Sequence, residues 1–136
     1  MANLRLMKQF INIFDTQQLN DLQDILVDDF YFKSPKIEIF GKQEYIEYAK
    51  DSGSVFTTDL VKLCEREENI YVHEYIVTMF DSQVKLNDQI HVIEYVKIRD
   101  GLIASSIIDY KMNDFSNSAR ILLKNTVKNH GNPIKN

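Results

Sequence analysis

QIHVIEYVKIRDGLIASSIIDYKMN, residues 89–113, is the segment from which most of the fold of this chain can be predicted. Residues that favour β-strands are dense on both sides of Asp100-Gly101, which predicts two long strands joined at that pair. Asp-Gly also suits a tight hairpin turn, because both central residues of such a turn need a positive φ angle. The stretch therefore predicts an antiparallel hairpin, and the other elements are expected to assemble on it.

Side chains on the first strand of this hairpin alternate between two faces. One face carries Ile90, Val92, Glu94, Val96 and Ile98. Glu94 is thus a carboxylate in an otherwise apolar row. Burying it there would be costly unless the group is hydrogen-bonded, protonated or at the edge of a cavity, so Glu94 is the first candidate for function.

The composition is that of an ordinary globular protein. The chain has 136 residues, of which 44% are hydrophobic and 26% are charged, enough for one domain with its own core. We expect residues 1–115 to form that domain, followed by a C-terminal helix and a flexible tail over residues 116–136. A net charge of -4 offers no basic surface for phosphate backbones, so nucleic acid is not expected as a partner.

Cysteine, histidine and hydropathy patterns limit the compartment and the cofactors. The lone cysteine, Cys64, cannot form an intramolecular disulfide, which suits a reducing compartment. No run of roughly 18 apolar residues is present, and the N-terminus does not resemble a signal peptide, so we expect a cytoplasmic protein without a membrane partner. His73, His91 and His130 lack the spacing of metal ligands, and we expect no metal and no cofactor.

Helices are expected before and after the long strands. Apolar residues at helical spacing predict a first helix near the N-terminus. Asp15 with Gln18 resembles a capping box, which predicts the start of a second helix that extends as far as Leu26. The later elements are expected to be two short strands, a third helix, four long strands and a last helix, over residues 30–34, 37–40, 43–50, 57–65, 70–80, 89–99, 102–113 and 116–127. Helices segregated to one side of an antiparallel sheet indicate the α+β class, and a strongly curved sheet closed by helices forms a cone with an interior.

Three groups of residues occur in a recognisable order: Asp28-Asp29-Phe30 through Ser34-Pro35, then Phe40-Gly41, then Asp100-Gly101-Leu102-Ile103. Their order and spacing resemble the nuclear transport factor 2-like (NTF2-like) superfamily, in its SnoaL-like branch. The resemblance implies a conical fold in which a strongly curved antiparallel sheet packs against three N-terminal helices and encloses a pocket. It also implies a homodimer formed through the β-sheet. It implies no single activity, because one fold carries many functions.

Members of the superfamily with known chemistry can be compared position by position. The chain resembles ketosteroid isomerases in register, but their base falls on Ser34 and their oxyanion-hole tyrosine on Phe10. Only their second oxyanion group keeps a carboxyl, at Glu94. The Asp-Arg-Asp set of limonene epoxide hydrolase-like members falls on Glu94, Val92 and Ile108. Both sets are incomplete, so neither chemistry is expected.

The same alignment assembles a candidate pocket around Glu94. It places His73 and Tyr75 on the inner face of the neighbouring strand, so Glu94 and His73 are the candidate catalytic residues for proton transfer. The candidate ligand-binding residues are Phe10, Ser34, Tyr75, Val77, Ser106 and Tyr110. The alternative for Glu94 is a structural hydrogen bond to Tyr75 or Tyr110, and for His73 a place in the core without a catalytic role.

Two functions of different classes agree with these patterns. The leading hypothesis is a small-molecule-binding protein whose pocket takes an apolar or aromatic molecule, with proton transfer of the isomerase, dehydratase or cyclase type at Glu94. The alternative is a catalytically silent dimeric association module, whose functional surface is the outer sheet face with Tyr95, Ile93 and Ile107. Tyrosine is frequent in the chain, and phenols suit a pocket for a flat molecule as well as core or interface positions.

Overall fold

The computed structural model describes residues 2–53, 56–79, 88–111, 116–127 and 130–134. Its helices are α1 (Ala2–Asp15), the 3₁₀ helix η1 (Leu19–Asp24), α2 (Lys42–Gly53) and α3 (Asn117–Val127). Its strands are β1 (Leu26–Lys33), β2 (Ile37–Phe40), β3 (Phe56–Glu67), β4 (Ile70–Met79), β5 (Gln89–Arg99), β6 (Leu102–Asp109) and β7 (Asn132–Pro133). The predicted order of helices, short strands and long strands is therefore confirmed, apart from the details given below.

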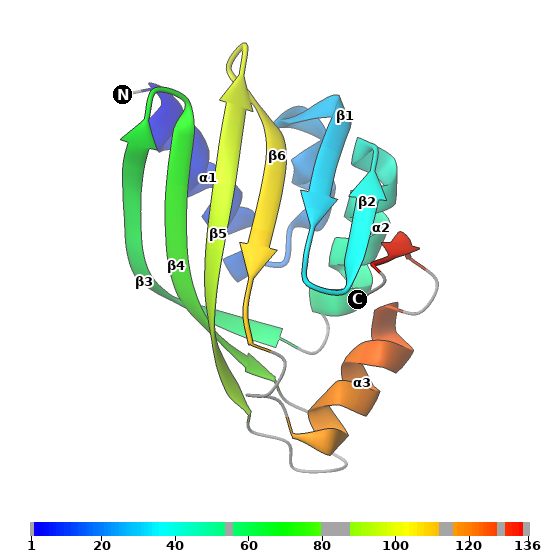
Figure 1. Ribbon diagram of the computed structural model, residues 1–136. Helices are drawn as coiled ribbons and strands as arrows, with labels where there is room; N and C mark the ends of the chain where they lie inside the picture. The colour runs from blue at the N-terminus through cyan, green and yellow to red at the C-terminus, as the bar shows by residue number, and fades with distance from the viewer. Residues whose placement is uncertain (1, 54–55, 80–87, 112–115, 128–129, 135–136) are drawn as a thin grey trace.

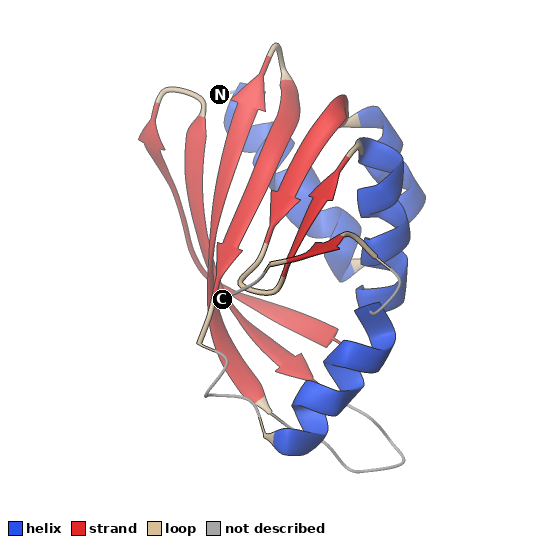
Figure 2. Cartoon of the chain, turned by 45° about the vertical axis from the view of Figure 1, so that its right-hand side comes forward, coloured by secondary structure: helices blue, strands red, loops and turns tan. Residues whose placement is uncertain are grey.

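The strands form one curved sheet in the order β3-β4-β5-β6-β1-β2-β7 (Figure 1). Neighbouring strands are antiparallel except β1 and β6, which run parallel, so the sheet is mixed and not wholly antiparallel as predicted. Helices α1, α2 and α3 lie on the same side of this sheet (Figure 2). The predicted α+β class, with a curved sheet packed against helices, is confirmed.

The hairpin predicted at residues 89–113 forms the centre of the sheet. Strands β5 and β6 pair antiparallel around Asp100 and Gly101, whose φ angles are 54° and 78°, as the tight turn requires. The predicted alternation along β5 is also confirmed, since Glu94 is 5% exposed whereas its neighbour Tyr95 is 37% exposed. Phe80 and residues 112–113, which we expected to extend strands, lie outside the described part of the chain.

The second helix differs from the prediction. Gln18 precedes the 3₁₀ helix η1 without a side-chain capping bond, so the proposed capping box is wrong. The strand β1 begins already at Leu26, which was expected to be helical, and Asp28 and Asp29 lie within it. The amide of Ile103 donates to the carbonyl of Ile25, because β6 offers this segment backbone partners that a longer helix could not use.

The C-terminal segment, where we expected a flexible tail, contains a short strand. Strand β7 pairs with β2, and the amide of Ile134 donates to the carbonyl of Lys36 at 2.8 Å. Just before it, Nε2 of His130 is hydrogen-bonded to the carboxylate of Asp51 at the end of α2. These bonds give the described part of the segment a defined place on α2 and β2.

Two clusters of buried side chains hold the helices to the sheet. The larger one lies between α1, η1, α2 and the sheet, and its fully buried members include Met7, Leu22 and Phe30. The smaller one holds α3 through Ala119, which packs with Met79 and other residues of the long strands. Among the described helices, none is long and apolar enough to cross a membrane.

Candidate functional site

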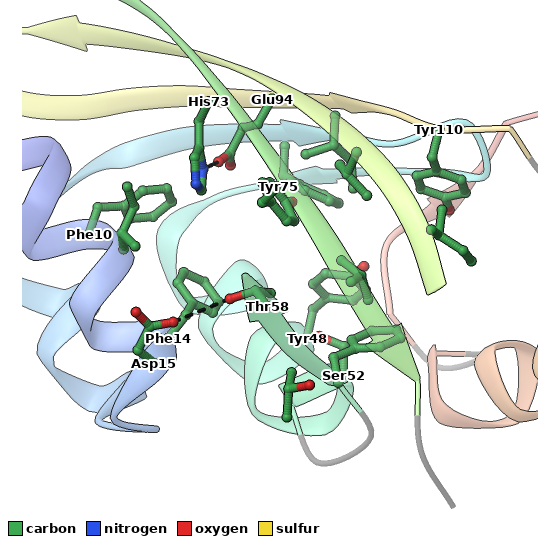
Figure 3. A pocket seen from close by; sticks show the side chains of 18 of the residues that line it. Phe10, Phe14, Asp15, Tyr48, Ser52, Thr58, His73, Tyr75, Glu94 and Tyr110 are labelled. Atoms are coloured by element: carbon green, nitrogen blue, oxygen red, sulfur yellow. Dashed lines mark hydrogen bonds and ion pairs between the residues drawn. The ribbon is translucent and has the colours of Figure 1, made fainter. Parts of the chain in front are cut away.

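A cavity of about 240 Å³ lies between the sheet and the helices (Figure 3). The inner faces of β4 and β5 supply one wall, helices α1 and α2 supply aromatic side chains, and α3 contributes Leu123. Most of the lining is aliphatic or aromatic, with few polar groups. A concave, mainly apolar cavity with a few polar side chains is the usual form of a small-molecule site.

His73 and Glu94 meet in this cavity because they are directly paired residues of β4 and β5. Nδ1 of His73 lies 2.9 Å from Oε1 of Glu94, and the two residues are 7% and 5% exposed. Ser106 of β6 lies diagonally opposite Glu94, and its hydroxyl donates a hydrogen bond to Oε2 of Glu94 at 2.5 Å. Each oxygen of the buried carboxylate therefore has a partner.

These bonds determine which nitrogen of His73 is left for a ligand. An ionised carboxylate only accepts hydrogen bonds, so Nδ1 of His73 carries the hydrogen that it donates to Glu94. In neutral imidazole the other nitrogen, Nε2, then keeps its lone pair. Nε2 is buried, and no group in the described residues hydrogen-bonds to it. A buried polar atom without a partner is uncommon, and this one belongs to a side chain that lines the cavity.

Tyrosine phenols surround this pair. The ring of Tyr75 packs on the ring of His73, with centroids 4.5 Å apart. Burial, and then the negative charge of Glu94, raise the pKa of Tyr75 well above its usual value, and the pKa of Tyr45 is raised by the same two causes. Both phenols therefore stay protonated at neutral pH and can donate hydrogen bonds inside the cavity.

Polar side chains mark the place where the cavity reaches the surface. Asp15 is the last residue of α1, Gln17 lies just after it, and Thr57 lies near the start of β3; all three are exposed lining residues. The hydroxyl of Thr58 donates to Oδ1 of Asp15 at 3.3 Å across this opening, away from His73 and Glu94 (Figure 3). The cavity thus has a polar opening and an aromatic interior with one buried charged group.

The structure can be compared with each predicted site residue. Those that line the cavity are Phe10, His73, Tyr75, Val77, Glu94 and Tyr110. Ser106 lies behind Glu94 as its hydrogen-bond donor, outside the lining. Ser34 is also outside it: its hydroxyl accepts bonds from the amides of Lys36 and Ile37 in the turn between β1 and β2. The roles assigned to these residues stay predictions.

Tyr110 connects Ser34 to the cavity. Burial raises the pKa of Tyr110, and a hydrogen bond with Ser34 lowers it by a smaller amount. Glu94 itself is bonded to His73 and Ser106, which differs from the bond to Tyr75 or Tyr110 that we considered.

Several lining residues were not predicted individually. Phe14 repeats the helical spacing of Phe10, so the sequence contained a signal for it that we read only as a core pattern. Tyr45 and Tyr48 were considered only as members of a tyrosine-rich composition, although their spacing puts both on one side of α2. Leu123 carries no local signal, because its place depends on how α3 folds back over the sheet.

Metal-binding side chains do not gather at this site. Within the described part of the chain, no group of three or more histidine, cysteine, aspartate or glutamate side chains is arranged to hold an ion. The polar chemistry that the site offers is therefore that of an imidazole, a carboxylate, phenols and hydroxyls.

Comparison with known proteins supports the fold. No protein-family model and no curated protein matches the chain. An NTF2-like protein of unknown function from Cytophaga hutchinsonii is similar in structure, with a TM-score of 0.69 and 20% identity over 82% of this chain and 91% of that one. An LEH-like epoxide hydrolase from Mycobacterium tuberculosis has a TM-score of 0.73 and 14% identity over 93% of this chain and 92% of that one.

A de novo designed protein with a curved β-sheet is equally similar in shape. Its TM-score is 0.73, at 10% identity over 93% of this chain and 95% of that one. At such identities the likeness concerns the fold alone, and the predicted NTF2-like fold is confirmed. Because the same shape occurs in an enzyme and in a designed protein, the activity must be argued from the site.

Proposed function

Because the chain has the NTF2-like fold and encloses a cavity, we propose that it binds a compact, mainly apolar ring compound and moves a proton on it. The observation that carries this proposal is the buried Nε2 of His73, which lacks a partner beside the cavity while Nδ1 is held by Glu94. In this proposal the proton transfer that we predicted at Glu94 takes place at His73. His73 is the residue that contacts the ligand, and Glu94 is a positioning residue.

The proposed step is proton abstraction next to a carbonyl group. Nε2 of His73 takes the proton, and the electron pair of the broken C–H bond moves to the carbonyl oxygen, forming an enolate. The charge of Glu94 stabilises the imidazolium, and a protonated phenol such as Tyr75 donates a hydrogen bond to the enolate oxygen. Return of the proton to the same or another carbon restores the imidazole. This chemistry belongs to the isomerase, dehydratase and cyclase types that we predicted.

Hydrogen–deuterium exchange on a flat cyclic ketone tests the step directly. We expect the protein to accelerate exchange of the α-protons of 2-indanone in D2O, followed by NMR, above the rate with denatured protein. Replacing His73 by Gln should lower the accelerated rate by roughly 100-fold or more, the usual contribution of a positioned base. Glu94→Gln should also lower it, because the amide cannot stabilise an imidazolium.

His91→Gln is the matched control, since His91 lies on the same sheet with its ring on the opposite face, bonded to Glu74. It should leave the exchange rate unchanged. If 2-indanone binds but His73→Gln exchanges it as fast as the unmodified protein, proton transfer at His73 is contradicted. If neither exchange nor binding of the ketone is found, the pocket assignment itself is wrong.

We propose homodimerisation through the outer sheet face as a second function, the one expected for a binding module. Val72, Tyr95 and Ile107 form a cross-strand row on that face, where Tyr95 is 37% and Ile107 is 39% exposed. A contiguous exposed apolar surface of this kind favours association with another protein surface. Analytical ultracentrifugation should find a dimer that Tyr95→Lys converts to a folded monomer, and a monomer at all concentrations would contradict it.

A further inference from the structure

We infer that the cavity selects its ligands by charge, taking neutral or cationic ring compounds and rejecting anions of the same shape. This inference deepens the proposed function and rests on it, because it concerns the occupant of the same cavity. We predicted an apolar or aromatic molecule as the ligand, and the inference adds that this ligand carries no negative charge where it meets His73.

The charges that line the cavity are negative. Glu94 is buried at its inner end, hydrogen-bonded to the hydroxyl of Ser106 and to Nδ1 of His73. With His73 as the neutral imidazole of the proposed step, neither partner carries a charge that would compensate the carboxylate. Asp15 adds a second carboxylate at the opening. The described lining contains no lysine or arginine. An anion entering from solvent would therefore lose its hydration without meeting an opposite charge.

Two phenols inside the cavity already show the effect of burial and of the negative charge of Glu94. Tyr45 and Tyr75 have pKa values raised first by burial and then by the charge of Glu94. A raised pKa means that the anionic form of each phenol is disfavoured at its place in the cavity. The same two causes act on a ligand anion at that place, since burial and repulsion depend on charge and position.

The free nitrogen of His73 favours the same class of ligand. Nε2 presents a lone pair, so it is best met by a hydrogen on the ligand, such as that of a hydroxyl, an ammonium or an activated C–H group. A carboxylate would bring its own lone pairs against Nε2 and would leave both without a hydrogen. The lone pair of Nε2 and the negative charge of Glu94 are therefore two separate reasons for an anion to bind weakly.

The size of the cavity identifies suitable probes. A volume of about 240 Å³ equals about eight molecules of liquid water, which suits a single ring with a short substituent. Benzyl alcohol, benzylamine and benzoate have this size and nearly one shape, but at neutral pH they are neutral, cationic and anionic. Differences among the three compounds therefore report charge and not fit.

Binding of these compounds to the full chain would be measured by amide NMR titration at pH 7, with the shifts of His73 and Tyr75 reporting the site. We expect benzyl alcohol and benzylamine to bind about tenfold or more tightly than benzoate, the effect of one charge acting over several ångströms at an intermediate effective dielectric constant. The preference should weaken only slightly with added salt, because a buried charge is poorly screened.

Glu94→Gln removes the inner charge while keeping the shape of the side chain, and the preference against benzoate should fall at least about threefold. Glu74→Gln is the matched control, because Glu74 is a carboxylate of β4 on the opposite face, bonded to His91. It should leave all three affinities unchanged.

Each result has a distinct meaning. Benzoate binding as tightly as benzyl alcohol, or an unchanged preference in Glu94→Gln, contradicts selection by charge while the pocket assignment stands. If none of the three compounds shifts His73 or Tyr75, the proposed occupation of the cavity fails, and selection by charge fails with it.

Discussion

His73 owes its chemical character to two neighbours that are distant in sequence. Ser106 holds Oε2 of Glu94, Glu94 holds Nδ1 of His73, and Nε2 is left without a hydrogen-bond partner among the described residues. The three residues come from β6, β5 and β4, which are adjacent in the sheet. A carboxylate fixed at both oxygens can hold an imidazole in one orientation, which is what a positioned base requires.

Ser106→Ala tests the first hydrogen bond in the series Ser106–Glu94–His73. Loss of the hydroxyl leaves one oxygen of a buried carboxylate without its donor, which should lower the free energy of unfolding by about 1.5–3 kcal/mol. Ser105→Ala is the matched control. Ser105 is the residue before Ser106 in β6, it is only half-buried, and its side chain points to the opposite face of the sheet. Its effect should stay within about 0.5 kcal/mol. Equal losses in the two variants, measured by urea unfolding, would contradict the role of Ser106.

From the sequence, Glu94 and His73 could be identified as candidate site residues, but the hydrogen bonds that join them to each other and to Ser106 could not. Alternation along the two strands, together with the resemblance to NTF2-like proteins, predicts that Glu94 and His73 share the inner face, as they do. The partner of Glu94 could not be chosen from alternation, because Ser106, Tyr75 and Tyr110 were all placed on that face. Rotamers and register decided the choice, and these depend on packing across three strands.

Among the single elements, the hairpin turn was predicted correctly from local sequence, whereas strand positions that depend on distant pairing were not. The hairpin at Asp100 and Gly101 was predictable because residues next to each other in sequence determine it. Strand β1 begins earlier than predicted because it pairs with β6, about 75 residues further along the chain, and no local pattern reports that pairing. The C-terminal strand β7 was missed for the same reason.

Gly131→Ala tests how that C-terminal strand is held. Gly131 has a φ of 66°, and an added Cβ would lie 2.5 Å from the carbonyl oxygen of Glu38 and 2.7 Å from Cγ1 of Ile39. The clash should separate β7 from β2, so that the amide of Ile134 loses its protection from hydrogen exchange.

Gly41→Ala provides the control, because Gly41 also has a positive φ, 102°, but nothing lies within 4 Å of its added Cβ. This variant should be less stable through backbone strain and should keep the Ile134 amide protected. If that amide exchanges equally fast in the two variants, the contact of Gly131 with β2 is not what holds the segment.

In the whole molecule, helices α1, α2 and α3 cover one side of the sheet, and no helix of the described residues covers the other (Figure 2). The covered side contains both the core and the cavity, so the ligand site is built from the same aromatic residues that stabilise the fold. Four of the seven tyrosines line the cavity, and burial raises the pKa of each.

The tyrosines predict how stability changes at alkaline pH. A hydrogen bond to Glu38 raises the pKa of Tyr31 to about 12, and burial raises those of Tyr45 and Tyr75 well above the usual value. Because these phenols ionise more easily in the unfolded chain, their contribution to stability is complete below a pH of about 10 and is lost as the pH rises through the folded values.

Phenolate absorbance followed together with far-ultraviolet circular dichroism checks this prediction. Ionisation of the buried phenols should coincide with loss of secondary structure above a pH of about 10. If Tyr45, Tyr48 and Tyr75 ionised with ordinary pKa values while the chain stayed folded, their phenols would not be buried, contrary to the structure.

The proposed chemistry requires that Nε2 of His73 carry no hydrogen, because Glu94 holds the hydrogen of Nδ1. Two-bond ¹H–¹⁵N NMR of the imidazole at neutral pH tests it most directly, with His73 assigned by the His73→Gln variant. We predict hydrogen on Nδ1, an unprotonated Nε2, and a change in the Nε2 shift when benzyl alcohol is added. Hydrogen on Nε2 with a bare Nδ1, or an Nε2 signal that benzyl alcohol leaves unchanged, would contradict the account.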